Sequence, residues 1–293
     1  MKIIVTGSES FVGKELIRQA KENKINIIGF DLIKKDNSDY EYYQIDINSQ
    51  DIAKKIPQNI DAIVHLAALS RDPDCKGKAY ECFENNVMGT LNLIRAAKEK
   101  NVKQFIFASS EWVYDEFKEN QSKNEGSPIN SLSLTSEYAL SKLTSEINLK
   151  QQYDNGFCNT TILRFGIIYG PRKNNWSAVE SIASQVKNKE EIRVGSLKNG
   201  RRFIHISDIA NGILKSLSLK GFNTINLSGD KIITIGDLIK TCEKFYHKKI
   251  KVVENDANEQ NIRNPSNQKA KEIIDWSPQI TLEDGLKTID KFL

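Results

Sequence analysis

The segment IIVTGSESFVG (residues 3–13) joins a short apolar run to a glycine turn and then to a stretch with helical spacing. Such a turn places backbone N–H groups at a helix N-terminus, where unpaired donors and the helix dipole favour a pyrophosphate. The residues predicted to bind a dinucleotide in this turn are Gly7, Ser10, Phe11, Val12 and Gly13. Ser10 stands where the usual motif has glycine, so its side chain would either crowd the ligand or donate a hydrogen bond to it.

Asp31 supports this interpretation, because it ends the second apolar run 24 residues after Gly7. A carboxylate at that position binds the ribose hydroxyls and repels a 2′-phosphate, so the pattern predicts NAD in preference to NADP. The alternative is an ordinary strand, turn and helix without a ligand.

Short apolar runs alternate with segments of helical spacing through the first half of the chain. The runs predicted as buried strands are 3–5, 25–30, 62–66, 105–108 and 161–165, and the predicted helices are 11–21, 79–98 and 137–151. This alternation predicts an α/β fold with a Rossmann-like, doubly wound parallel sheet. After about residue 166 the alternation of apolar runs and helical segments becomes less regular, which predicts a smaller, mixed α/β C-terminal region. A polar loop is expected from 115 to about 134.

Composition excludes several classes of protein. Of 293 residues, 39% are hydrophobic and 27% are charged, the balance of a folded globular chain. The net charge is only +4, and the charged residues are spread along the chain, so the sequence predicts neither a nucleic-acid nor a membrane partner. The four cysteines lack CxxC spacing and neighbouring histidines, so we expect no metal site. No signal-peptide pattern and no long apolar stretch is present, so we expect a cytoplasmic protein.

Tyr138 and Lys142 form the second chemical motif, because residues four apart share one face of a helix. A nearby ammonium lowers the cost of a phenolate, so Tyr138 is predicted to exchange a proton with a substrate. Ser110, at the end of the preceding apolar run, is predicted to share the proton of the same substrate alcohol. Hydride would leave the same carbon for the nicotinamide.

With these motifs the chain resembles extended short-chain dehydrogenases/reductases of the nucleotide-sugar epimerase/dehydratase family, over nearly its whole length. Further matching segments occur in the family's order: DI (46–47), VHLAA (64–68), NVMGT (86–90) and FASSEWVY (107–114). The resemblance implies additional NAD-binding residues, which are Asp46, Ile47, Leu66, Ala67, Ala68 and Asn86, together with Tyr138 and Lys142. It also implies an NAD-binding domain over 1–165 and a mainly nucleotide-sugar-binding region over 166–293, of which about 204–230 returns to the first domain.

The second half of the chain extends the resemblance through LRFGIIYGPR (163–172), RRFIHISD (201–208) and the closing segment 273–286. In relatives, arginines at the positions of Arg201 and Arg263 bind the substrate diphosphate, as guanidinium groups suit phosphate oxygens. The substrate-binding residues that the resemblance implies are Ser109, Ser110, Arg172, Arg201 and Arg263. Ile167 replaces a frequent asparagine, and Trp276 has the character of a core residue.

The residues after Ser110 bear on the reaction. In sugar-nucleotide 4,6-dehydratases of the family the hydroxyl residue is followed by Asp-Glu, whereas Ser110 is followed by Glu111-Trp112. Glu111 could replace the acid, but Trp112 cannot abstract a proton. The resemblance therefore favours an NAD-dependent nucleotide-sugar epimerase with Ser110, Tyr138, Lys142 and, as a further candidate, Glu111 as catalytic residues. Glu111 is equally well interpreted as a solvated side chain.

Other functions stay open from the sequence: a 4,6-dehydratase, a 4-keto-sugar reductase, or a non-catalytic dinucleotide-binding sensor or assembly subunit. Family members dimerise through two long helices from each subunit, here 79–98 and 137–151. The resemblance therefore implies a homodimer, with a role in nucleotide-sugar supply for polysaccharide biosynthesis.

Overall fold

The computed structural model describes residues 1–114, 116–118 and 121–293, so part of the predicted polar loop at 115–134 lies outside the described residues. The chain divides into two compact units. Unit 1 comprises Met1–Asp115, Pro128–Arg164 and Ala210–Ile225, and unit 2 comprises Glu116–Ser127, Phe165–Ile209 and Asn226–Leu293. Each unit therefore draws on three separate stretches of the chain.

A seven-stranded sheet forms the centre of the described part of unit 1, in the order β11-β6-β5-β4-β1-β2-β3. Its strands are β1 (Lys2–Thr6), β2 (Asn26–Asp31), β3 (Glu41–Gln44), β4 (Ala62–His65), β5 (Gln104–Ser110), β6 (Asn159–Phe165) and β11 (Phe222–Leu227). Strand β1 pairs in parallel with both β2 and β4, and the chain reverses its direction of winding there. The structure confirms the predicted Rossmann-like, doubly wound sheet.

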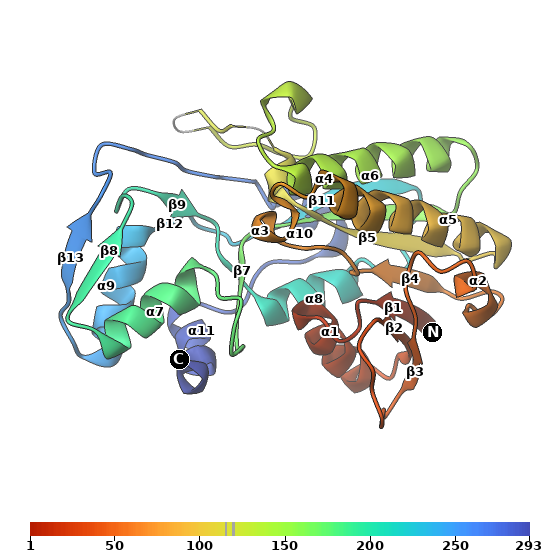
Figure 1. Cartoon of the computed structure of the whole chain (residues 1–293), viewed down its shortest axis with the longest axis horizontal. Helices are drawn as coiled ribbons and strands as arrows, with labels where there is room; N and C mark the ends of the chain where they lie inside the picture. Colours follow the sequence, from red (N-terminus) through yellow and green to blue (C-terminus); the bar gives the residue numbers. More distant parts are fainter. Residues whose placement is uncertain (115, 119–120) are drawn as a thin grey trace. The chain divides into compact units, whose positions relative to one another are not determined.

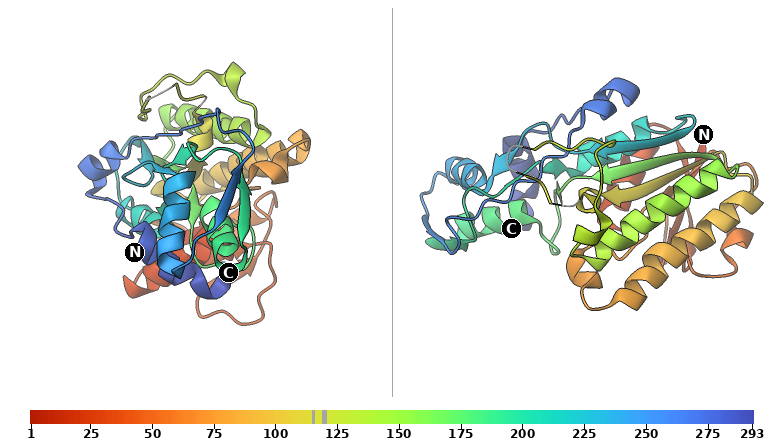
Figure 2. Two further views of the ribbon diagram at one scale, coloured as in Figure 1. Left: turned by 90° about the vertical axis from the view of Figure 1, so that its left-hand side faces the viewer. Right: turned by 90° about the horizontal axis from the view of Figure 1, so that it is seen from above.

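Helices cover both faces of this sheet. Helix α1 (Phe11–Glu22) lies on one face, and α5 (Gly89–Glu99) and α6 (Glu137–Asp154) lie side by side on the other (Figures 1 and 2). The shorter elements of the unit are α2 (Ile52–Lys55), α3 (Asp72–Cys75), α4 (Ala79–Phe83), η2 (Glu111–Val113) and η3 (Ser131–Ser133). Helix α6 is 18 residues long and places residues 138 and 142 at the carboxyl end of β5.

The segment predicted as one helix over 79–98 departs from that prediction in its middle. A π-helical turn, Glu84–Met88, separates α4 from α5. It turns Asn86 into the interior, where the side chain is 1% exposed. Single π-turns of this kind are frequent at functional sites.

Strand β3 was not predicted, and its composition explains why. Tyr42 and Tyr43 are half-buried between exposed Glu41 and Gln44, so the strand carries no continuous apolar run. By contrast, Ile3, Ile4, Ile63 and Phe105 of the central strands are fully buried, as expected of a parallel sheet covered on both faces.

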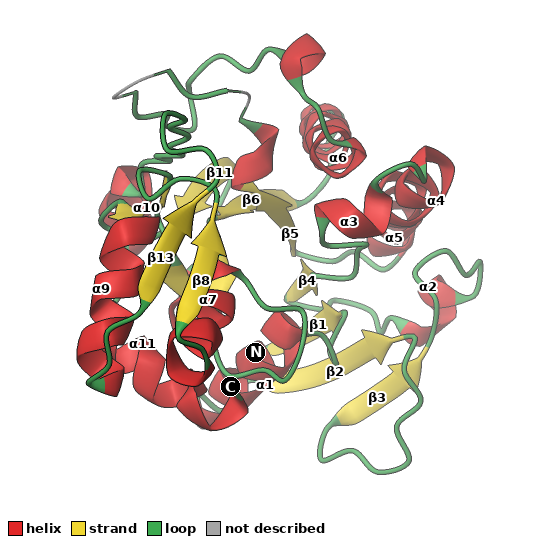
Figure 3. Cartoon of the chain, turned by 60° about the vertical axis from the view of Figure 1, so that its left-hand side comes forward, coloured by secondary structure: helices red, strands yellow, loops and turns green. Residues whose placement is uncertain are grey.

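Unit 2 has its own core. Helices α7 (Ala178–Asn188) and α9 (Ile235–Tyr246) pack together beside a parallel pair, β8 (Glu191–Val194) and β13 (Lys251–Glu254) (Figure 3). The remaining elements of the chain are β7 (Ile168–Tyr169), β9 (Gly200–Arg201), β10 (Ile204–His205), β12 (Ile233–Thr234), α8 (Ile206–Lys215), α10 (Gln268–Ile274), α11 (Leu282–Ile289) and η4 (Asp290–Phe292). Trp276 is 1% exposed and donates its indole N–H to the Asp208 carbonyl, as its interpretation as a core residue requires.

Within the described ranges, no helix is long and apolar enough to cross a membrane.

Candidate active site

The glycine turn after β1 is built so closely that side chains are excluded from two positions. Gly7 has φ +69°, and a Cβ there would lie 2.8 Å from the Ala67 nitrogen. A Cβ on Gly13 would lie 2.2 Å from the Gly7 carbonyl oxygen. The turn therefore needs glycine at both positions, and it leads directly into the N-terminus of α1, where helix N–H groups lack intrahelical acceptors.

Ser10 fits the turn without strain. Its backbone is extended, with φ −68° and ψ 169°, a conformation that needs no glycine. Its Oγ accepts a hydrogen bond from the Gly13 nitrogen at 3.1 Å and so caps α1. This contact shows how a serine is accommodated where the usual motif has glycine.

Asp31 is held in place at the end of β2 by two backbone donors. Its Oδ2 accepts from the Glu9 nitrogen at 2.8 Å and its Oδ1 from the Ile33 nitrogen at 3.1 Å. Further along the sheet edge, Asp46 is exposed and accepts from the Asn48 nitrogen. Ile47 is 7% exposed and belongs to the core of unit 1.

A buried hydrogen-bond network joins the end of β1 to the π-turn. Thr6 Oγ1 lies 2.7 Å from His65 Nδ1, and His65 Nε2 lies 3.0 Å from Thr90 Oγ1. Because the Thr90 hydroxyl donates to the Asn86 carbonyl, it accepts from His65, which assigns the ring proton to Nε2. Burial lowers the pKa of His65 to about 3, so the ring is neutral and cannot act as a base that cycles near neutral pH.

Asn86 continues the network to helix α6. Its side-chain amide donates to the Leu69 carbonyl and to Ser141 Oγ, and its Oδ1 accepts from the Leu69 nitrogen. These bonds fix the chain after Leu66, Ala67 and Ala68 against α6. Leu66 is 9% exposed, Ala67 and Ala68 are half-buried, and the backbone of Ala67 lies against Gly7.

Tyr138 and Ser110 meet in the interior of unit 1. They are 8% and 7% exposed, and they are hydrogen-bonded to each other. Burial raises the pKa of Tyr138 to about 12, although the bond with Ser110 acts in the opposite direction. The effect of burial therefore exceeds the lowering predicted from the sequence, and the phenol is protonated at neutral pH.

Lys142 lies one turn further along α6 and is 4% exposed. Its Nζ donates to the Ala108 carbonyl at 2.8 Å and lies 4.8 Å from the centre of the Phe107 ring and 5.9 Å from that of Tyr138. Burial lowers the pKa of Lys142 to about 8. The predicted trio of Ser110, Tyr138 and Lys142 is thus brought together by β5 and α6.

Glu146 and Arg164 form a buried ion pair behind this trio. Arg164 Nη2 donates to Glu146 Oε2 at 2.6 Å, and Ser109 Oγ donates to Glu146 Oε1 at 2.5 Å. The Arg164 guanidinium also lies 4.8 Å from the centre of the Tyr114 ring. The pair therefore fixes both ends of the segment that carries Ser110, a role that the sequence did not reveal.

Glu111 is 1% exposed, so the interpretation of Glu111 as a solvated side chain is wrong. Its neighbour Trp112 is half-buried and packs against the cluster formed by Tyr138, Cys75 and Cys82. The described cysteines carry free thiols.

Cationic side chains gather in unit 2. Arg201 donates to the carbonyls of Gly200 and Asn261, and the Arg263 nitrogen donates to the Gly200 carbonyl, so neighbouring segments carry both predicted arginines. The Arg263 guanidinium and the Lys123 ammonium lie 5.0 and 5.2 Å from the centre of the Phe117 ring. Lys123 is 4% exposed, and burial together with the Arg263 charge lowers its pKa. No sequence pattern indicated Lys123.

Arg172 lies in the same unit and is paired with an acid. Its Nε donates to Glu180 Oε1 at 2.7 Å, and its Nη2 donates to the Ile168 carbonyl. Glu180 is fully buried and also accepts from the Gly170 and Ser177 nitrogens. The Arg172 guanidinium therefore stabilises the turn after β7.

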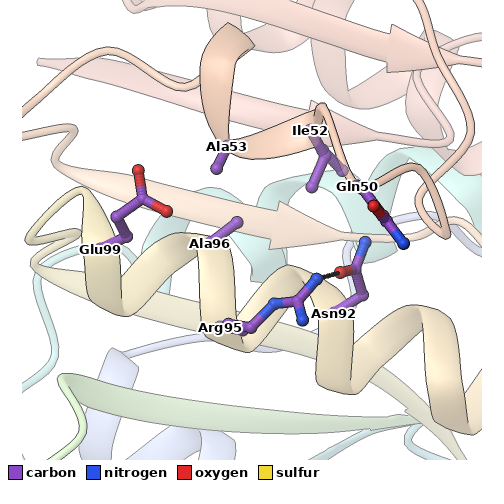
Figure 4. Close-up of a pocket in the computed structure, with 7 residues that line it drawn as sticks. All are labelled: Gln50, Ile52, Ala53, Asn92, Arg95, Ala96 and Glu99. Atoms are coloured by element: carbon purple, nitrogen blue, oxygen red, sulfur yellow. Dashed lines mark hydrogen bonds between the residues drawn. The ribbon is translucent and has the colours of Figure 1, made fainter.

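A separate hollow of about 340 Å³ lies between α2 and α5 (Figure 4). Its lining residues are Gln50, Ile52, Ala53, Asn92, Arg95, Ala96 and Glu99. On the α5 side of the hollow, Arg95 donates to Asn92, one turn earlier on the same helix. No residue predicted for the active site lines this hollow.

Comparison with known proteins agrees with the geometry. The model of the NAD dependent epimerase/dehydratase family matches residues 3–227, more than half of the chain. The chain belongs to this family. The residues present fit the dinucleotide of a family member: the turn leads into the N-terminus of α1, whose N–H groups would bind the pyrophosphate, and the Asp31 carboxylate at the end of β2 would bind the ribose.

Individual family members cover nearly the whole chain. UDP-glucuronate 4-epimerase of Thermodesulfobacterium geofontis is 28% identical over 260 residues, covering 86% of this chain and 79% of that protein. UDP-glucuronic acid decarboxylase 4 of Arabidopsis thaliana is 25% identical over 301 residues, covering 99% of this chain and 68% of that protein. The structure of UDP-glucuronic acid 4-epimerase from Bacillus cereus, in complex with UDP-glucuronic acid and NAD, superposes with a TM-score of 0.86 at 26% identity and covers 100% of this chain and 98% of that one.

Proposed function

We propose that this family member is an NAD-dependent epimerase that inverts C4 of the sugar in a UDP-sugar. The observation that carries the proposal is the buried trio of Ser110, Tyr138 and Lys142 at the end of β5, in the same unit as the glycine turn. The epimerase relatives named above support UDP-glucuronate as the first substrate to test.

Bound NAD would supply the hydride acceptor and a positive charge that favours the phenolate form of a nearby tyrosine. Tyr138 Oη would take the proton of the C4 hydroxyl when C4 is oxidised and would return the proton to the same oxygen when C4 is reduced again. The Ser110 hydroxyl holds the same substrate oxygen. Lys142, whose ammonium lies 5.9 Å from the centre of the Tyr138 ring, supplies a cation that stabilises the phenolate.

The remaining predicted contacts belong to the same proposal. Asp31 would bind the adenosine ribose and Asp46 the adenine. Arg201 and Arg263 of unit 2 would bind the diphosphate of the sugar nucleotide, and Lys123, which shares the Phe117 ring with Arg263, would add a further positive charge.

The decarboxylase relatives raise a second candidate reaction on the same substrate. Epimerisation and decarboxylation both begin with oxidation at C4, and the groups after Ser110 decide the next step of the reaction. Trp112 offers no acid or base at its position, and this favours return of hydride without loss of a carboxyl group or of water.

The test is incubation of the purified protein with NAD and a panel of UDP-glucuronate, UDP-glucose and other nucleotide sugars, with products followed by chromatography and mass spectrometry. We expect an isomer of unchanged mass, and at least a hundredfold slower turnover in Tyr138→Phe. A product lighter by carbon dioxide or by water would overturn the epimerase proposal. Binding of NAD without turnover of any sugar would favour a non-catalytic role.

We also propose a cytoplasmic homodimer. Apolar side chains that are exposed in the single chain lie on α4, the π-turn and α6: Tyr80, Met88, Leu140 and Ile147, with 75%, 57%, 39% and 52% exposed. Leu140 and Ile147 are seven residues apart and share one face of α6. Sedimentation of Leu140→Asp/Ile147→Asp beside the unchanged protein tests this, and we expect the variant to be monomeric.

A further inference from the structure

Glu9 lies inside the glycine turn, and the turn's own chemistry does not require an acid there, because it acts through backbone N–H groups. Its side chain is 11% exposed and is surrounded by donors. Glu9 Oε1 accepts from the Tyr40 hydroxyl at 2.6 Å and from Lys35 Nζ at 2.8 Å. Glu9 Oε2 lies 3.6 Å from Lys14 Nζ. One carboxylate thus meets two ammonium groups and a phenol.

This cluster adjoins the position predicted for the adenosine ribose. The Glu9 nitrogen donates to Asp31 Oδ2, so the backbone that carries the Glu9 carboxylate also positions Asp31. The Tyr40 ring covers the start of the same turn, since a Cβ on Gly29 would lie 2.5 Å from Tyr40 Cε2 and 2.8 Å from Ser8 Oγ. Glu9 therefore holds the segment 32–40, which follows Asp31, against the turn.

The charges of the cluster nearly cancel. Burial raises the pKa of Glu9, but hydrogen bonds from Lys35 and Tyr40 outweigh burial and lower it, so the carboxylate is ionised at neutral pH. Lys35 also lies 4.5 Å from the centre of the Tyr40 ring, which further fixes its ammonium. The lysines of this cluster are therefore paired with Glu9, while Asp31 adds a second negative charge beside them.

Enzymes of this fold that take NADP use a basic side chain near the end of β2 to bind the 2′-phosphate. Lys35 is a basic side chain in the segment after β2, and its ammonium is 2.8 Å from Glu9. We propose that Glu9 is a cofactor-specificity residue, which neutralises Lys35 and Lys14 and thereby prevents them from binding a 2′-phosphate. The inference rests on the dinucleotide site proposed above and assigns the discrimination to Glu9 in addition to Asp31.

The test is equilibrium titration of the purified full-length protein with NADH and with NADPH, followed by nicotinamide fluorescence, so that no sugar turnover is needed. In Glu9→Gln we expect the Kd for NADPH to fall about fivefold to tenfold, because one negative charge near a doubly charged phosphate is removed. The Kd for NADH should change less than about twofold. Glu22→Gln, which removes the same charge at the far end of α1, should leave both values unchanged.

The double variant Glu9→Gln/Lys35→Met separates discrimination from a structural effect. We expect it to lose most of the gain in NADPH binding while it still binds NADH. An equal change of both Kd values in Glu9→Gln, or a gain that persists without Lys35, would overturn the proposal. Absence of NADH binding by the unchanged protein would overturn the cofactor site as a whole, whereas an unaltered ratio with intact NADH binding overturns only the role of Glu9.

Discussion

Replacing Lys142 by methionine is expected to stabilise the protein while it abolishes turnover. Burial lowers the pKa of Lys142 from 10.5 to about 8, and this difference corresponds to roughly 3 kcal/mol of unfavourable free energy when the ammonium is buried at neutral pH. Methionine has a similar length and no charge. Methionine cannot donate to the Ala108 carbonyl, and the loss of this hydrogen bond destabilises the variant by about 1.5–3 kcal/mol, the usual contribution of a bond from a charged donor. The net gain at pH 7 is therefore about 1 kcal/mol.

The pH dependence makes this prediction specific. Between pH 8 and 10.5 the unfolded chain binds a proton at Lys142 that the folded protein does not, so the stability of the unchanged protein rises with pH. At pH 9.5 about 2 kcal/mol of the penalty has disappeared, so the stability advantage of Lys142→Met over the unchanged protein should be lost. Thermal unfolding followed by circular dichroism at both pH values measures the crossover.

The control is Lys150→Met in the same helix, where the exposed ammonium pairs with Asp154 and replacement should change stability by less than about 0.5 kcal/mol. A difference between Lys142→Met and the unchanged protein that does not vary from pH 7 to 9.5 would refute the reasoning.

Three further predictions concern buried groups. The unchanged protein should lose about 2 kcal/mol of its free energy of unfolding between pH 7.5 and 5.0, because burial keeps the folded His65 ring neutral while the unfolded ring binds a proton. His65→Gln should not show this loss, and urea titrations at both pH values measure it. Arg164→Met should cost about 3–5 kcal/mol, because it leaves the Glu146 carboxylate buried without its cation, and a loss below 1 kcal/mol in thermal unfolding would contradict this. Gly285→Ala should cost about 1–3 kcal/mol, because the new Cβ would lie 2.2 Å from the Tyr169 hydroxyl oxygen; an unchanged melting temperature would show that the ring moves freely.

The parts of the fold and site that the sequence predicted are those encoded by neighbouring residues. The glycine turn is one continuous segment, and Tyr138 and Lys142 are four apart on one helix, so their proximity follows from helical geometry. Ser110 could be added because parallel strands present their carboxyl ends at one edge of a sheet. The binding partners of these residues stay predictions until ligands are tested.

The features that the sequence did not predict depend on contacts between distant residues. Glu146 and Arg164 lie on different elements, and nothing in either segment alone indicates that they pair. Lys123 reaches Phe117 and Arg263 only because the bridge between Lys123 and Pro265 brings two remote segments together. The pKa of Tyr138 is likewise raised by burial, whereas the sequence predicted that it would be lowered, since the cost of removing a phenolate from water does not follow from the spacing of residues.

The division of each unit into three stretches has a consequence for synthesis on the ribosome. Strand β11 closes one edge of the seven-stranded sheet, yet its residues, Phe222–Leu227, follow two of the three stretches of unit 2 along the chain. The first six strands of the sheet, by contrast, end at Phe165. Because the ribosome adds about 5–20 residues per second, the edge of β6 stays uncovered for several seconds before β11 has been synthesised. An uncovered strand edge is a template for association with other chains, so this interval is when the nascent protein is most exposed to aggregation and most in need of chaperones.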